Sequence, residues 1–175
     1  MTAISLQLEP NSLYICLTQL LVPGFHWGLY FTDNGGIATC HEWAEVRGRR
    51  DLTQPVEAYQ VAHSHPVTVN DAQNRLNLAF VKVLGYTPPS SQYDLQARFA
   101  AIEPSGGYSD VRRNRKSGLS CRTWLMRALG LLQEDGVIRR DTPVSNIEGA
   151  VKEIGTEVEE RLGEGEDLDT QIRTV

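Results

Sequence analysis

The 175-residue sequence lacks several features that would set it apart from ordinary globular domains. Its three cysteines, Cys16, Cys40 and Cys121, form neither a disulfide framework nor a CxxC metal motif, so we expect a reducing, cytoplasmic setting. The net charge is −5, and the lack of a basic excess argues against a nucleic-acid partner. The first ten residues lack the segments of a secretory signal, and no apolar run is long enough to span a bilayer, so no stable membrane anchor is expected.

The first part of the chain has the composition of strands. Runs of large apolar and aromatic residues, separated by turn residues, predict strands over 12–21, 25–31, 37–46 and within 56–69. Asn34-Gly35 lies between two of these runs, and such a pair between strands is a strong hairpin signal.

Helical spacing dominates the remainder. It predicts helices from Asn70 or Asp71 to Gly85, from Ser120 to about Gln133, and from a capping box at Ser145–Glu148 onward. The segment 92–102 is open between strand and helix, and 103–118 is predicted to be a loop that orders over a ligand. The fold class expected is α+β, a small antiparallel sheet packed by helices. Residues 1–162 form a single domain, and 163–175 an acidic, frayed tail.

The hairpin at Asn34-Gly35 determines which side chains share a face. With a two-residue turn, paired residue numbers add up to 69, so Gly28 lies opposite His41 and His26 opposite Trp43. His26 and His41 then project from the same face as diagonal neighbours. We therefore expect a pair of imidazoles on adjacent strands.

Cys121 follows Ser120, the expected N-cap of a helix. A helix N-terminus carries a partial positive charge, which stabilises a thiolate and lowers the thiol pKa. Cys121 is therefore the candidate nucleophile, with packing in the core as the alternative. Cys16 and Cys40 are interpreted as structural, Cys40 on the face opposite the histidines. His26 would be the base and His41 the residue that orients it.

Three short segments resemble the circularly permuted papain-like superfamily, which includes lecithin:retinol acyltransferase-like and NlpC/P60-type proteins. They are His26-Trp27-Gly28-Leu29-Tyr30, the strand bearing His41, and Ser120-Cys121-Arg122-Thr123-Trp124. The segments also resemble small fungal proteins that share these elements. The chain departs from the acyltransferase branch, because it has Ser-Cys-Arg-Thr-Trp around the cysteine and an acidic C-terminus in place of an apolar anchor.

The resemblance implies a permuted papain-like architecture and a thiol enzyme. The expected reaction is hydrolysis of, or acyl transfer from, a small amide, thioester or ester, with a possible tailoring role in secondary metabolism. The alternative is a non-covalent cyclase, dehydratase or isomerase, or a binding protein that uses the same histidine-lined pocket. Candidate substrate-binding residues are Trp27, Tyr30, Trp43, Arg112, Arg113, Arg115 and Arg122.

Other sites are less favoured by the sequence. His63 and His65, together with His41, could ligate zinc, but no compact spacing with a second cysteine occurs, so neither a metal nor another cofactor is expected. The apolar stripe that begins at Ile147 is either core or the surface of a homodimer. The partner expected throughout is a small-molecule substrate.

Overall fold

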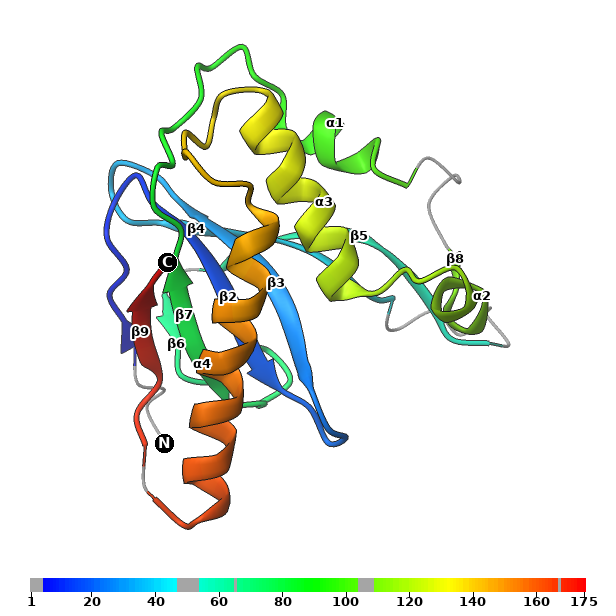
Figure 1. Ribbon diagram of the computed structural model, residues 1–175, viewed down its shortest axis with the longest axis vertical. Helices are drawn as coiled ribbons and strands as arrows, with labels where there is room; N and C mark the ends of the chain where they lie inside the picture. Colours follow the sequence, from blue (N-terminus) through cyan, green and yellow to red (C-terminus); the bar gives the residue numbers. More distant parts are fainter. Residues whose placement is uncertain (1–4, 47–53, 65, 104–108, 167) are drawn as a thin grey trace.

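The computed structural model describes residues 5–46, 54–64, 66–103, 109–166 and 168–175. Within them the chain forms a seven-stranded sheet in the order β8-β5-β4-β3-β2-β7-β9 and a small two-stranded sheet of β1 and β6 (Figure 1). The strands are β1 (Ser5–Leu6), β2 (Leu13–Gln19), β3 (Phe25–Thr32), β4 (Ala38–Glu45), β5 (Val56–Ser64), β6 (Val67–Thr68), β7 (Asn77–Lys82), β8 (Ser109–Asp110) and β9 (Gln171–Thr174). All pairs are antiparallel except β7–β9, which confirms an α+β fold with a mostly antiparallel sheet.

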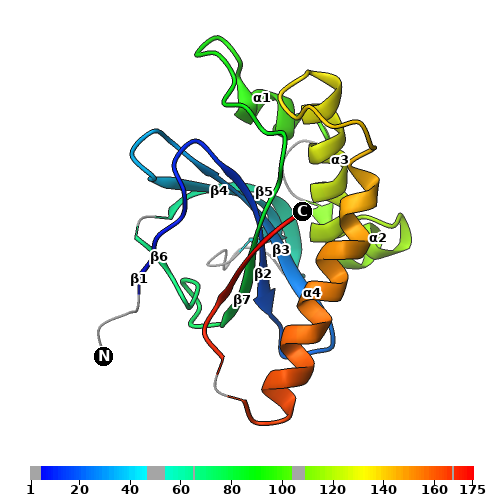
Figure 2. The same ribbon diagram turned by 60° about the vertical axis from the view of Figure 1, so that its left-hand side comes forward.

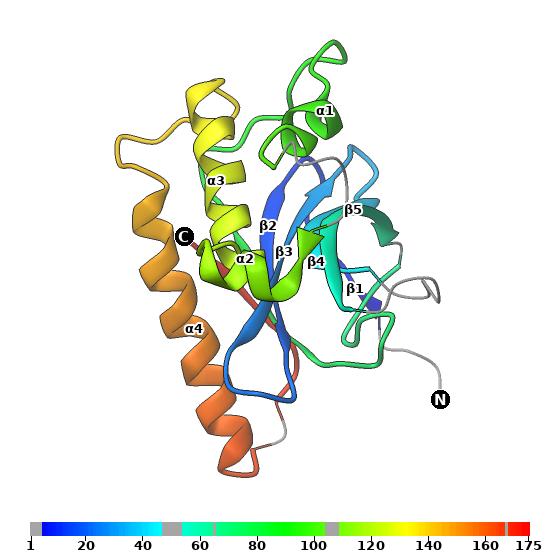
Figure 3. The same cartoon turned by 90° about the vertical axis from the view of Figure 1, so that its right-hand side faces the viewer.

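Two long helices cover one face of the large sheet. The helices are α1 (Leu95–Ala100), α2 (Val111–Lys116), α3 (Cys121–Glu134) and α4 (Ser145–Gly163). Figures 2 and 3 show α3 and α4 on one side of the sheet, and Figure 2 shows β1 and β6 on the other. The apolar stripes of α3 and α4 are buried in the main core, including Trp124, Leu129, Ile147 and Val151. Since the sheet covers the stripe that begins at Ile147, this stripe is core and is not free to form a dimer surface.

The hairpin between β3 and β4 differs from the expected two-residue turn. Leu29 pairs with His41 and Tyr30 with Cys40, so paired numbers add up to 70. The connection contains one more residue because Gly36 adopts a left-handed conformation with φ of 80°, a conformation that typically closes three-residue hairpin loops. A shift of one residue transfers every side chain of one strand to the other face relative to its partner. His26 and His41 therefore project from opposite faces.

The segment expected as a helix from Asn70 or Asp71 to Gly85 is a turn followed by β7. The Asp71 carboxylate accepts hydrogen bonds from the backbone N–H groups of Gln73 and Arg75, and Asn74 has a positive φ of 60°. This side-chain turn stops a helix before it begins. Residues 77–81 are all buried, as expected for a central strand covered on both faces.

Three other expectations differ from the structure. The C-terminal segment, expected to fray from Gly163 onward, returns to the sheet, where β9 pairs in parallel with β7. Of the loop 103–118, residues 104–108 lie outside the described part, whereas 109–116 form β8 and α2. Helix α4 begins at Ser145 as expected, but its N-cap is Val144 and no side chain caps it.

Candidate active site

Cys121 is the first residue of α3. The Ser120 side chain accepts a hydrogen bond from the Thr123 N–H, and the Thr123 hydroxyl accepts one from the Ser120 N–H, so the helix start is fixed by a reciprocal capping box. The thiol is partly buried and its Sγ lies 4.0 Å from the Phe25 carbonyl oxygen on β3. The expected position of Cys121 at a helix N-terminus is confirmed.

The thiol reaches the sheet where β3 and β4 separate. The β3–β4 ladder ends at the pair Leu29–His41, although β4 remains paired with β5 as far as Glu45. Residues 25–28 of β3 therefore have no partner on that side. The backbone N–H of Trp27 points at the Cys121 sulfur, as does that of Arg122. Because the strands separate here, Cys121 at the start of α3 lies in the same hollow as His26.

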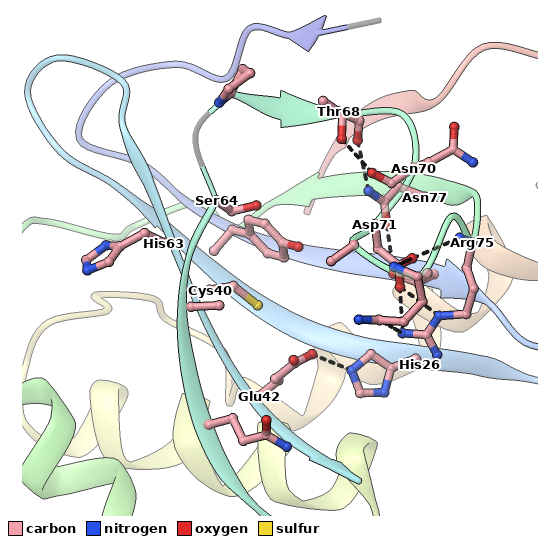
Figure 4. Close-up of a pocket in the computed structure, with 17 residues that line it drawn as sticks. His26, Cys40, Glu42, His63, Ser64, Thr68, Asn70, Asp71, Arg75 and Asn77 are labelled. Atoms are coloured by element: carbon pink, nitrogen blue, oxygen red, sulfur yellow. Dashed lines mark hydrogen bonds and ion pairs between the residues drawn. The ribbon is translucent and has the colours of Figure 1, made fainter. Parts of the chain in front are cut away.

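His26 is held by Glu42, not by His41. Its Nε2–H donates a hydrogen bond of 2.6 Å to the Glu42 carboxylate (Figure 4). The other ring nitrogen, Nδ1, is left free of Glu42, and the Cys121 thiol lies near enough to the ring for each side chain to shift the pKa of the other. Glu42 therefore occupies the orienting position that the sequence assigned to His41. Cys121, His26 and Glu42 are thus the candidates for nucleophile, base and orienter.

Electrostatics favour the ionised form of the cysteine–histidine pair. Burial acts against charge on His26, but its interactions as a donor with Cys121 and Glu42, together with their negative charges, raise the pKa of His26 to about 9. Burial also opposes ionisation of Cys121, yet the hydrogen bond and positive charge of His26 and two backbone N–H groups lower the thiol pKa below its usual value. Both shifts favour transfer of the thiol proton to His26, which gives a thiolate and an imidazolium.

The site opens into two adjoining hollows of about 430 and 440 Å³. They share His26, Glu42, Gln60, Gln73 and Arg75. Only the second is lined by Cys121, whereas the first extends along the face opposite α3 and α4 to Thr68, Asn70 and Asn77 (Figure 4). Together they form one cleft with the catalytic groups near its middle.

His41 lies on the opposite face of the sheet, among the aromatic rings of the main core. It is 3% exposed, and its Nδ1 lies 2.7 Å from the Tyr59 hydroxyl oxygen. Its ring packs edge-on against Phe31 and Phe99. Burial lowers the pKa of His41 to about 4, so the ring is neutral. His41 is therefore separated from Cys121 and His26 by the sheet.

The aromatic residues expected to bind substrate have different positions. Trp27 is buried in the main core beneath the helices. Tyr30 is buried on the His26 face and lines the first hollow, together with Cys40. Cys40 thus shares a face with His26, contrary to expectation, but burial raises its thiol pKa well above the usual value. Trp43 lines the second hollow.

Arg115 has a structural role in the described protein. Its guanidinium forms an ion pair of 2.5 Å with the buried Glu57 carboxylate and donates to the Leu119 carbonyl at 2.8 Å. Glu57 also accepts hydrogen bonds from the Trp43 indole and the Asn114 amide. This network fastens α2 to β5 and holds the chain just before Cys121.

The other arginines expected at the site lie away from the thiol. Arg122 is paired with Glu148 of α4 at 2.8 Å. Arg112 and Arg113 lie on α2, and neither is among the residues that line the cleft in the described part of the chain. Arg112 instead borders a small hollow beside Pro55.

Sequence reasoning missed Glu42 and the Arg75–Asp71 pair at the cleft. Arg75 and Asp71 form an ion pair of 2.6 Å within the turn that precedes β7. The sequence indicates Glu42 only if the hairpin loop has three residues. With that loop length the residue after His41, which is Glu42, lies on the same face as His26. The signal for Arg75 was the Asp71-Ala72-Gln73-Asn74 sequence, a turn composition that was interpreted as a helix start.

Comparisons with models of known families, with curated proteins and with solved structures find no match to this chain. Among the described residues, no group of three or more histidine, cysteine, aspartate or glutamate side chains is arranged to hold a metal ion. His65, one of the histidines considered for zinc, lies outside the described residues. No helix in the described ranges is both long and apolar enough to cross a membrane.

Proposed function

We propose that this protein is a cysteine-dependent hydrolase or acyltransferase that acts on a small amide, thioester or ester. The observation that carries the proposal is the arrangement at one cleft of Cys121 at a helix start, His26 beside it, and Glu42 bonded to His26 at 2.6 Å. The opposite pKa shifts of Cys121 and His26 support the proposal, because they favour the thiolate form of the nucleophile.

The reaction follows from these positions. The Cys121 thiolate attacks the substrate carbonyl carbon and a carbon–sulfur bond forms. The His26 imidazolium gives its proton to the departing amine, thiol or alcohol as that bond breaks, which leaves an acyl group on Cys121. Neutral His26 then takes a proton from water or an acceptor alcohol or amine, whose attack breaks the carbon–sulfur bond and restores the thiolate. Glu42 holds the ring and stabilises its positive charge.

The start of α3 supplies donors for the oxyanion. Ser120 and Thr123 satisfy each other's backbone N–H groups through their side chains, whereas the N–H groups of Cys121 and Arg122 have no oxygen partner within the described residues. These two groups belong to the first turn of α3 beside the thiol, and we assign them to the carbonyl oxygen that gains negative charge under attack. The helix dipole acts in the same direction.

The order of the elements supports a permuted papain-like architecture. A histidine strand, β3, precedes the strand bearing the orienting residue, β4, and the cysteine helix, α3, follows later in the chain. The cleft is sized for a small substrate, and its polar lining suits a tailoring step on a small metabolite. Three free cysteines support a reducing, cytoplasmic setting.

A second candidate function is acid–base catalysis without a covalent intermediate. It is favoured by the first hollow, which contains His26 and Glu42 but not Cys121 among its lining residues. A substrate bound there would meet the His26–Glu42 pair directly, and Cys121 would serve only as a charged neighbour.

The deciding experiment is acylation of the intact protein with p-nitrophenyl acetate, followed by mass spectrometry of its peptides. We expect one acetyl group on Cys121, a burst of p-nitrophenol, and loss of both in Cys121→Ala. Cys40→Ser is the matched control and should react like the wild type, because the buried Cys40 thiol stays protonated. An unacetylated Cys121, with turnover retained in Cys121→Ala, would instead favour the acid–base reaction.

A further inference from the structure

A third hollow lies on the face of the sheet opposite His26. It has a volume of about 1290 Å³ and is bordered by the β3–β4 hairpin and by the segment from Tyr86 to Gln96. His41 reaches it from β4, whereas Cys121, His26 and Glu42 do not contribute to its lining. The hollow therefore shares His63 with the first hollow of the cleft but contains none of the three groups proposed for the thiol chemistry.

The hydrogen bond of His41 bears on which ring nitrogen carries the proton. Burial raises the pKa of Tyr59 above its usual range, so its hydroxyl is protonated, and its one hydrogen-bond partner in the described part of the chain is the Nδ1 atom of His41 at 2.7 Å. The arrangement on which the inference rests has the Tyr59 O–H donate to Nδ1. Neutral His41 then carries its proton on Nε2.

The Nε2–H group of His41 is a donor without a partner inside the described protein. No hydrogen bond of Nε2 is found among the described residues. The polar atoms that are both fully enclosed and unpartnered do not include it, so the atom is not sealed inside the protein. His41 itself is 3% exposed. Since His41 is one of the residues that line the hollow, this donor is available to a bound molecule there.

The walls of the hollow select the ligand. Phe31, Tyr86 and Tyr93 offer aromatic surface, and two prolines lie beside them. The described lining contains no lysine or arginine, and it includes the carboxylates of Asp33 and Asp94. An anionic ligand is thus disfavoured, whereas an uncharged planar molecule gains contact with the rings.

We propose that this hollow is a second binding site, which takes an uncharged aromatic compound with a carbonyl group, and that the His41 Nε2–H donates to the carbonyl oxygen. The aromatic body packs against Phe31 and Tyr86, whose rings touch each other edge-on with centroids 5.7 Å apart, and beside Tyr93. Tyr59 acts as a positioning residue, because it holds His41 in the donating tautomer. This site does not depend on the chemistry at Cys121.

The test uses three small probes on the intact protein, observed through the histidine nitrogen and the aromatic resonances. Benzamide should shift the signals of His41, Tyr86 and Tyr93, whereas toluene, which lacks the carbonyl, and benzoate, which is charged, should bind more weakly. In His41→Phe the dissociation constant for benzamide should rise about three- to ten-fold, the loss typical of one neutral hydrogen bond. Toluene binding should be unchanged in that variant.

Controls separate this site from the catalytic cleft. Cys121→Ala should bind benzamide like the wild type. In the wild type without a probe, the nitrogen spectrum should show His41 protonated at Nε2, and this measurement requires no variant to fold. A proton on Nδ1, equal affinity for benzamide and benzoate, or benzamide shifts confined to His26 would overturn the proposal.

Discussion

Acidification should destabilise the protein through His41. Its pKa is lowered to about 4 in the folded state by burial, whereas an unfolded histidine titrates near 6.5. The stabilisation associated with neutral His41 is therefore complete above pH 6.5 and is lost as the pH falls from 6.5 toward 4, because only the unfolded chain takes up the proton. With these values, the unfolding free energy should fall by about 2 kcal/mol between pH 7.5 and pH 5 on account of this one residue.

The assay is urea unfolding, followed by tryptophan fluorescence at pH 7.5 and pH 5. Between pH 7.5 and pH 5 the unfolding free energy of the wild type should fall by about 2 kcal/mol more than that of the double variant His41→Phe/Tyr59→Phe. The double variant removes both polar groups together, so that neither is left buried without its partner. The exposed His63 provides a matched control, and His63→Gln should follow the wild type. An equal loss in the wild type and the double variant would refute the assignment of a neutral, buried His41.

Three other predictions concern the catalytic cleft and its support. Cys121→Ala should reduce the turnover of a small ester or thioester by about 10³-fold or more without change in the far-ultraviolet spectrum, and retained turnover would exclude the nucleophile. Turnover should fall as the pH rises through about 9, where His26 loses the proton that it gives to the leaving group, and this upper limb should move to lower pH in Glu42→Gln; an unmoved limb would show that Glu42 does not act on His26. Arg115→Gln should lower the unfolding free energy by about 1–3 kcal/mol in urea titrations, because it weakens the ion pair of the buried Glu57, whereas a raised KM with unchanged stability would indicate a direct substrate contact.

The sequence by itself determined the features that depend on neighbours along the chain. The Ser120 cap and the spacing of apolar residues after it place Cys121 at a helix start, since a cap and an amphipathic stripe are local properties. The aromatic and β-branched runs likewise placed β2, β3 and β4. An α+β fold and the positions of His26 on a strand and Cys121 at a helix start follow from these elements.

The length of the β3–β4 hairpin loop, one residue longer than expected, determines which side chains lie beside His26. Asn34-Gly35 and the longer loop closed by Gly36 are both compatible with the sequence, because glycine at either position tolerates a positive φ. The pairing of β3 with β4 decides between the two loops. Only one register places the apolar side chains of both strands on the face of the main core. The longer loop brings Glu42 to His26 and sends His41 into the aromatic core.

Tertiary structure alone also decided the role of the segment around β7 and of the arginines. Leu76, Phe80 and Val83 have helical spacing, yet burial on both faces between β2 and β9 makes this stretch a strand. The sequence around Arg115 is typical of a solvent-exposed basic loop. In the structure Arg115 pairs with Glu57, which lies 58 positions away in the chain. Contacts over such separations are set by packing and charge between distant elements, which local sequence does not encode.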